Sequence, residues 1–366
     1  MTISDRGALP KLAVLAALLV ATPAMASFQA ADLIYIPAVA KTTGSGTSNW
    51  KTDIYITNVD EVAIDVAMVY LPSGLVSNSS YFIDRTYWLG GREDDGFGFL
   101  NEELADIPPN GTVVLRNVVG EYWVDQTGLN GMGAMVVFAY EANTLEDDGT
   151  RVYRNAIANA RIYNDTELWE RDPDGHGFVE VPTTYGQQMP GVAWYNLADP
   201  AAIGDDFDFT YMILTGGEQT ARYRYNLGLL NASDPQTQIT VSLQAFQANG
   251  EPYLDDQGEP LITLQTVPIL AHLQWYRAFS TLWDLEEVEA AMIKVSFVAW
   301  SSTAPDPIPA LITYGSLIDE VSDDPTTVMG AFADPYDIDC MWNGGGTPVT
   351  PKSGRISRRP VEIAPR

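Results

Sequence analysis

The stretch Trp50-Lys51-Thr52-Asp53-Ile54-Tyr55-Ile56-Thr57-Asn58 indicates the class of fold. Ile54 and Ile56 alternate with polar or aromatic residues, and alternation at every second position is typical of a strand with one buried face. Asn58 is a residue type favoured where a chain turns out of a strand. A related stretch, Tyr225-Asn226-Leu227-Gly228-Leu229-Leu230-Asn231, occurs later. The sequence therefore predicts that the chain uses the same strand twice.

The rest of the chain reads as further short strands separated by clusters of Gly, Pro, Asn and Asp. No helical period is sustained for more than about two turns, although a short helix is expected over 285–291. The prediction is an all-β protein. The strands expected in the first part are Leu33–Val39, Ala63–Leu71, Thr112–Val118, Gly131–Tyr140 and Ala156–Tyr163.

The order of these features repeats about halfway along the chain. A repeat longer than about 100 residues, with strands in each copy, indicates tandem domains. We predict two antiparallel β-sandwich domains of the immunoglobulin-like type, at residues 27–195 and 209–333, joined by a linker at 196–208. The pairs of residues that we align are Asn58 with Asn231, Pro108 with Pro268, Phe138 with Phe297, Tyr163 with Tyr314, and Met189 with Met329.

The two ends of the chain differ in character from this body. Two basic residues, an apolar run at 12–21, and Ala24-Met25-Ala26 match a secretory signal, so residues 1–26 are predicted to be a signal peptide. The mature chain is then expected to begin at Ser27 and to be exported to the periplasm or the medium. Residues 334–366 are rich in Gly, Pro and basic residues, and we expect a flexible basic tail there.

The charge and cysteine content of the chain limit its possible binding partners and its cross-links. The chain has a formal net charge of -28. Removing the signal and the residues after Cys340 takes seven of 20 basic residues and two of 48 acidic ones, which leaves 13 bases against 46 acids. Such a surface repels nucleic acid, so none is expected as a partner. Cys340 is the single cysteine, so no disulfide within the chain is possible. No apolar run after the signal reaches the roughly 20 residues of a transmembrane helix.

Several short motifs together resemble a module of secreted, mostly uncharacterised bacterial proteins. They are Trp50-Lys51-Thr52-Asp53, Pro108-Pro109-Asn110-Gly111, Gly131-Met132-Gly133-Ala134 and Tyr185-Gly186-Gln187-Gln188-Met189-Pro190. The resemblance covers Leu33 to about Gly191, and it implies an exported β-sandwich without implying an activity. The second copy departs from the pattern, because Tyr223-Arg224-Tyr225-Asn226 stands where W-[KR]-T-D is expected.

The sequence offers little support for a catalytic site. Ser48 and Lys51 have the S-x-x-K spacing of serine acyl enzymes, but that mechanism needs a helix and this site enters a strand. His176 and His272 are the only histidines, which leaves almost no material for a triad or a multi-histidine zinc site. His272 is expected to be a half-buried strand residue. A glycosidase needs only two carboxylates, and the sequence singles out no pair.

Acidic loops are the better candidates for a site. Several place Asp or Glu beside a residue that permits a tight turn, which suits calcium. The preferred site is formed by Asp172 and Asp174, because Pro173 and Gly175 preset the bend between the two carboxylates. Solvated turns are the simpler explanation of such loops.

The sequence as a whole therefore favours a secreted, acidic, non-catalytic protein that acts as a surface, matrix or binding component of a bacterium. Polysaccharide and other surface proteins are the partners it suggests, and calcium is the one cofactor. The alternative is a carbohydrate-active or other hydrolytic enzyme that uses two carboxylates.

Overall fold

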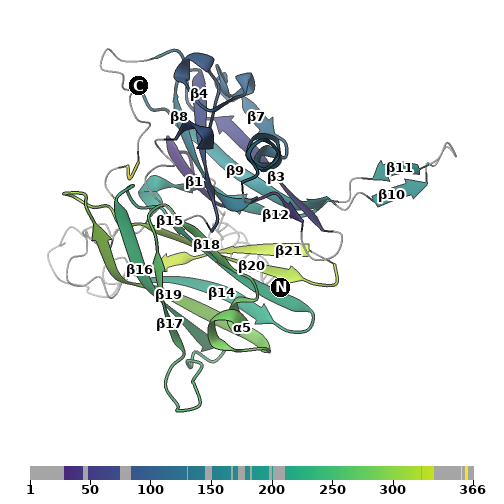
Figure 1. The fold of residues 1–366 in the computed structure, drawn as a ribbon, viewed down its shortest axis with the longest axis vertical. Coiled ribbons are helices and arrows are strands. Elements are labelled where there is room, and N and C mark those ends of the chain that lie inside the picture. The colour runs from purple at the N-terminus through teal and green to yellow at the C-terminus, as the bar shows by residue number, and fades with distance from the viewer. Residues whose placement is uncertain are drawn as a thin grey trace, which may run out of the picture.

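The structure is a computed structural model that describes residues 29–43, 48–74, 84–129, 131–144, 151–165, 168–171, 178–181, 184–197, 200, 211–322, 324–333, 356 and 359–361. The predicted signal peptide and most of the predicted linker lie outside these residues. The described chain is all-β, as predicted, and its strands form antiparallel sheets except for the parallel pair β5–β6. We call residues 29–197 the first half and residues 211–333 the second half (Figure 1).

The first half contains two main sheets. One has six strands in the order β13-β1-β8-β4-β5-β6, and the other has the order β12-β9-β3-β2, with β7 also pairing with β3. A separate hairpin, β10–β11, stands away from both sheets (Figure 1). The bounds are β1 Leu33–Ala40, β2 Thr42–Thr43, β3 Asn49–Asn58, β4 Ile64–Pro72, β5 Trp88–Gly90, β6 Phe99–Leu100, β7 Thr112–Leu115, β8 Met132–Glu141, β9 Ala156–Asp165, β10 Leu168–Arg171, β11 Phe178–Val181, β12 Thr184–Pro190 and β13 Val192–Ala193.

The second half also contains two sheets. Their strand orders are β17-β16-β19-β14-β22 and β18-β15-β20-β21. The bounds are β14 Tyr211–Gln219, β15 Tyr223–Asn231, β16 Thr237–Gln247, β17 Ile262–Val267, β18 His272–Trp275, β19 Val288–Ser302, β20 Leu311–Asp319, β21 Asp324–Met329 and β22 Ala331–Ala333.

The two halves have the same strand order. The path β13-β1-β8-β4-β5 of the first half matches β22-β14-β19-β16-β17 of the second, strand for strand in chain order. The path β12-β9-β3-β7 likewise matches β21-β20-β15-β18. Each half therefore places nine equivalent strands at equivalent positions, and β2, β6 and the β10–β11 hairpin are additions to the first half.

Burial follows from how many faces of a strand are covered. β9 and β16 alternate between buried and partly exposed positions, as expected for strands with one covered face. Every residue of β4 is buried, because both of its faces are covered. One face packs inside the first half, and the other packs toward the second half and the chain's C-terminal residues.

Three apolar cores hold the molecule together. One lies between the two sheets of the first half, and another lies between the two sheets of the second half. The third, which we call the interface core, joins Leu33 and Tyr35 of β1 to Leu230 of β15 and Ile312 of β20. Burial of apolar surface is the main stabilising term in folding, so the contact between the halves is an integral part of the fold.

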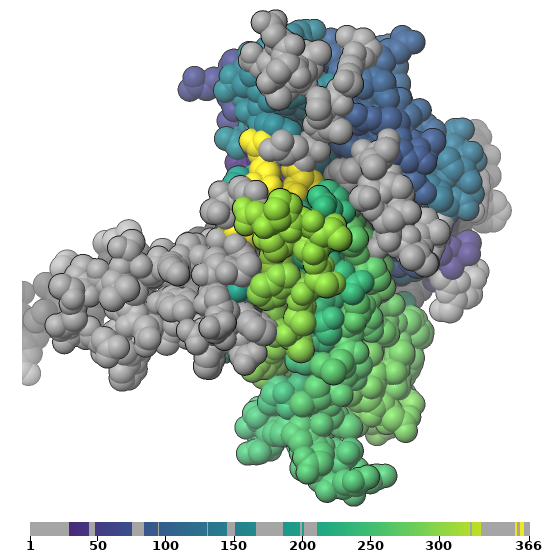
Figure 2. All heavy atoms as spheres, turned by 60° about the vertical axis from the view of Figure 1, so that its left-hand side comes forward, coloured from purple at the N-terminus to yellow at the C-terminus, as the bar shows by residue number. Residues whose placement is uncertain are grey.

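Four residues of the segment expected to be a flexible tail are described, and they are packed. Ile356 and Val361 are buried in the interface core. The Arg359 Nη2 atom lies 2.7 Å from an Asp32 carboxylate oxygen, and its guanidinium stacks on Tyr153 at 3.6 Å. Figure 2 shows these residues, in yellow, between the two halves. The chain's C-terminal region thus contributes to the joint.

One turn has the same geometry in both halves. The side-chain amide of Asn58, at the end of β3, donates to the carbonyl of Ile107 at 2.8 Å, and that of Asn231, at the end of β15, donates to the carbonyl of Val267 at 3.2 Å. Each Asn side-chain oxygen accepts from the backbone N–H two residues later. The alignment of Asn58 with Asn231 therefore describes equivalent hydrogen bonds.

Helices are few and short in the described chain. The helix expected at 285–291 is wrong, because the chain has already turned through α5, Ala278–Trp283, and β19 begins at Val288. None of the described helices is long and apolar enough to cross a membrane. The other helical segments are η1 Arg85–Tyr87, η2 Glu93–Asp95, η3 Glu102–Leu104, η4 Gly120–Val124, α3 Asp125–Thr127 and η5 Trp194–Asn196.

Candidate functional site

A cleft of about 280 Å³ lies where the two halves meet. Strands β1, β2, β3, β8, β9 and β12 line it from the first half, and β15, β18 and β20 line it from the second. Most of the lining is aliphatic or aromatic, including Val39, Met132, Ile162, Trp50 and Tyr276. Amide and hydroxyl side chains complete it. Pockets between packed units, apolar with a few polar groups, are the usual form of a small-molecule site.

Hydrogen bonds across the joint fix one wall of the cleft. The side-chain oxygen of Gln187, on β12, accepts from the hydroxyl of Ser316 at 3.0 Å and from that of Thr327 at 2.8 Å. Both donors belong to the second half. Gln187 therefore ties the two halves together at the edge of the cleft, so the relative position of the two walls is defined by specific bonds.

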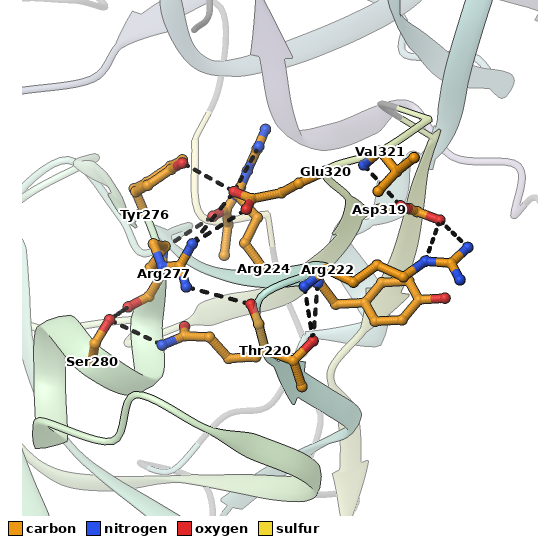
Figure 3. Close-up of polar contacts among 12 residues, drawn as sticks. Thr220, Arg222, Arg224, Tyr276, Arg277, Ser280, Asp319, Glu320 and Val321 are labelled. Atoms are coloured by element: carbon orange, nitrogen blue, oxygen red, sulfur yellow. Dashed lines mark hydrogen bonds and ion pairs between the residues drawn. The ribbon is translucent and has the colours of Figure 1, made fainter.

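Arg224 is the only charged side chain among the described residues that line the cleft. It lies on β15, and only 8% of its surface is exposed. Its guanidinium lies 5.1 Å from the ring of Tyr276. The Nη1 atom donates to Glu320 at 3.3 Å, and Nε is buried without a hydrogen-bond partner among the described residues (Figure 3). An unpartnered buried donor is unfavourable, so this arginine has hydrogen-bonding capacity that the described protein does not use.

Glu320 is shared among several donors. Arg224 and Arg277 both contact it, each with a closest distance of 3.3 Å, and the hydroxyl of Tyr276 donates to it at 3.3 Å (Figure 3). Ion-paired hydrogen bonds are usually about 2.7–2.9 Å long, so these contacts are loose. Two guanidinium groups thus share one carboxylate at the edge of the cleft.

A buried polar chain borders the same cleft. The hydroxyl of Tyr314 lies 2.7 Å from His272 Nε2 and donates to the side-chain oxygen of Gln274 at 3.1 Å. Tyr314 and Gln274 line the cleft, whereas His272 lies behind them. Burial lowers the pKa of His272 to about 4. The expectation of a half-buried His272 is wrong, since only 1% of its surface is exposed.

Ser48 and Lys51 do not form a catalytic pair. β3 begins at Asn49, so the two residues are separated by extended chain and not by a helical turn. Lys51 Nζ lies 2.5 Å from an Asp165 carboxylate oxygen, which commits its charge to an ion pair. An acyl-enzyme mechanism needs a free basic group beside the nucleophile, and this geometry does not supply one.

The acidic loops that are described have structural roles. Asp95 accepts from the hydroxyl of Tyr140 at 2.8 Å and pairs with Arg151 at 2.7 Å. Asp255 accepts from two backbone N–H groups of its own turn. No group of three or more potential metal ligands occurs in the part of the chain that the structure describes. The predicted calcium site, Asp172 and Asp174, lies outside the described residues, as does His176.

Carboxylates buried in the first half are also fully engaged. Asp53 accepts from the guanidinium of Arg116 and from the backbone N–H of Asn117. Asp65 is likewise paired with Arg92 at 2.5 Å. Among the described residues, the side chains lining the cleft include neither Asp nor Glu. The described part of the lining thus supplies no pair of carboxyl groups of the kind that glycoside hydrolysis uses.

Comparison with known proteins does not assign the chain to a family. No protein-family model matches the chain, and no curated protein matches its sequence.

The sequence predictions missed the residues that form the cleft. Arg224 did appear in them, as part of the Tyr223–Asn226 stretch that departs from the W-[KR]-T-D pattern. Within that stretch Arg224 occupies the basic position of the pattern, and the available signal was Asn226, which stands where the pattern has Asp. Gln187 belongs to a motif of the first half, but nothing in its spacing indicates that it contacts the second half.

Proposed function

We propose that this is an exported, non-catalytic binding protein built from two copies of one β-sandwich domain of the immunoglobulin-like type. Its binding site is the cleft between the copies. The observation that carries the proposal is the lining of that cleft, which combines apolar walls, several amide and hydroxyl groups and one buried arginine with unused hydrogen-bonding capacity. These features suit recognition of a small molecule.

The tandem-domain part of the proposal is supported by the matched strand orders and by the equivalent turns at Asn58 and Asn231. Export is supported by the signal-like residues 1–26. N-terminal sequencing of protein recovered outside the cytoplasm is expected to begin at Ser27.

The binding role is supported over the hydrolytic alternative by the chemistry of the lining. Hydrolysis of a glycosidic bond uses two carboxyl groups that flank the bond, one as an acid and the other as a base or nucleophile. The described lining supplies hydroxyl and amide groups, and its one ionised group is a cation. Such groups bind and orient a molecule without activating it for attack.

A cavity-filling variant tests the site. Ala40 lines the cleft, and Ala40→Phe places a ring in it, whereas Ala299→Phe makes the same change at an exposed position of β19. A fragment library is screened by thermal shift on the mature chain. We expect the compounds that raise the melting temperature of wild type and Ala299→Phe by about 3 °C or more to leave Ala40→Phe unchanged. Equal stabilisation of Ala40→Phe would show that binding occurs elsewhere.

A further inference from the structure

The charge in the cleft is opposite to that of the protein around it. The body carries 46 acidic residues against 13 basic ones, yet Arg224 is the single ionised side chain in the part of the cleft lining that the structure describes. An apolar cavity with one cationic group is complementary to a molecule that has an apolar body and one anionic end. The surrounding acids would discourage anions in general, so any anion that enters needs apolar contacts as well.

The geometry of Arg224 favours a planar anion. Its hydrogen bond to Glu320 uses Nη1, so the side of the guanidinium formed by Nε and Nη2 makes no hydrogen bond to a described residue. That side presents two parallel N–H groups, which match the two oxygens of a carboxylate. A tetrahedral phosphate dianion would need more donors than this one cation and its neutral neighbours provide.

The size of the cleft limits the rest of the ligand. A volume of about 280 Å³ is near the lower end of the roughly 300–1,000 Å³ typical of ligand sites. Val39, Met132 and Ile162 offer apolar contacts within it. A short alkyl chain or a single ring fits these walls, whereas a polysaccharide chain would extend well outside them.

We infer that the cleft binds a small amphipathic carboxylate, with its carboxylate on the Nε and Nη2 side of Arg224 and its apolar part against Val39, Met132 and Ile162. This inference rests on the proposed binding role of the cleft and specifies the ligand class. Glu320 acts as the internal competitor, since its loose contact of 3.3 Å neutralises part of the charge of Arg224.

The test uses three eight-carbon probes, octanoate, octan-1-ol and octylamine, titrated calorimetrically into the full mature chain. Wild type is expected to bind octanoate at least tenfold more tightly than octan-1-ol, and to bind octylamine most weakly. Arg224→Met should reduce octanoate affinity at least tenfold, to the level of the alcohol. Arg222→Met is the matched control, because Arg222 is two residues away, is largely exposed, and pairs with Asp319 outside the cleft.

A second pair of variants includes one that is expected to raise octanoate affinity, and an unfolded protein could not show such an increase. Glu320→Gln removes the internal competitor and should tighten octanoate binding about threefold or more. Asp319→Asn makes the equivalent change at the neighbouring pair with Arg222 and should leave affinity unchanged. Octanoate binding equal to that of octan-1-ol, absence of octanoate binding, or the same affinity in Arg224→Met and Arg222→Met would each overturn the inference.

The outcomes also separate this inference from the proposed function. One outcome is that octan-1-ol binds wild type but not Ala40→Phe, with octanoate binding no more tightly than the alcohol. That result would support the cleft as a binding site and contradict the inference that its ligand is a carboxylate. Fragment hits that bind Ala40→Phe as tightly as wild type would show that the cleft is not the binding site.

Discussion

The two halves of the molecule use the same strand positions for different purposes. In the first half, Lys51 of β3 pairs with Asp165 at 2.5 Å, one cation to one anion. At the equivalent positions of the second half, Arg224 of β15 contacts Glu320 at 3.3 Å, and Arg277 shares that carboxylate. The first pair is a close contact between one cation and one anion. The second pair leaves Nε of Arg224 without a hydrogen-bond partner among the described residues, beside the cleft.

A neighbouring position shows the same difference. Asp53 of the first half binds the guanidinium of Arg116 and the N–H of Asn117, and its equivalent in the second half, Asn226, accepts only from the N–H of Arg277 at 3.2 Å among the described residues. Asn226 carries no charge, so it forms no ion pair of the kind that Asp53 forms with Arg116. The strand positions thus match in the two halves, while the charges at equivalent positions differ.

The largest expected effect tests what the halves share. Asn231→Ala removes a buried side chain that donates to three backbone carbonyls, and Asn58→Ala removes one that donates to two. Because each leaves buried carbonyls unpaired, we expect losses in the free energy of unfolding of about 3–4 kcal/mol and about 2–3 kcal/mol, respectively. Urea unfolding measures both. A loss below about 1 kcal/mol in either variant would contradict the shared structural role.

An intermediate effect concerns His272, a buried histidine of the second half. The pKa of His272 is about 4 in the fold, and an unfolded histidine has a pKa near 6.5. The unfolded chain therefore binds more protons between these values, so this contribution to stability is fully present above pH 6.5 and is lost as the pH falls toward 4. The expected loss by pH 5 is about 2 kcal/mol relative to pH 7.5.

The control for that prediction is His272→Gln, which removes the titrating group. Urea unfolding of both proteins at pH 7.5 and pH 5 separates the histidine from the many carboxylates, which titrate in both. The pH-dependent loss should be smaller in His272→Gln by about 2 kcal/mol. Identical pH dependence in the two proteins would show that His272 is not buried in neutral form.

The smallest effect sharpens the contrast between the equivalent basic residues. Lys51→Met breaks an ion pair that is partly exposed, so we expect a loss of less than about 1 kcal/mol in stability. Octanoate affinity should be unchanged, because Lys51 does not line the cleft. Calorimetric titration beside Arg224→Met makes the comparison. A similar loss of octanoate binding in both variants would mean that the two halves do not differ in the way proposed.

Much of the fold was predictable, because short-range patterns specify strands and turns. The alternation around Ile54 and Ile56 predicted β3, and the side chains of Asn58 and Asn231 make the equivalent bonds that their alignment suggested. These features depend on residues close in sequence or on one turn residue, so a single chain reveals them.

Alignment within strands was less successful. In the first half, Tyr163 lies opposite Lys51. In the second half, the residue opposite Arg224 is Ile318, so Ile318 and not Tyr314 is the equivalent of Tyr163. Phe138 packs in the interface core, whereas Phe297 packs inside the second half. Tyr314 lies four residues from the equivalent position, and Phe297 packs in a different core from Phe138, so matching aromatic residues by identity alone did not find equivalent positions.

The cleft could not be predicted, because it exists only where two halves distant in sequence meet. Gln187 and Ser316 are 129 residues apart and bond across the joint. Nothing in the local pattern around Arg224 specifies which strands of the first half will face it. Sequence reasoning therefore favoured clusters of adjacent acids, whose chemistry is visible without knowing the packing.

The pairing of Arg359 with Asp32 has a consequence for the order in which the protein is completed. Arg359 is synthesised 327 positions after Asp32. Leu33 and Tyr35 lie in the same core as Ile356 and Val361, so this core is incomplete until residues 356–361 have been made. A chain synthesised from its N-terminus would leave that apolar surface uncovered until residues 356–361 have been made.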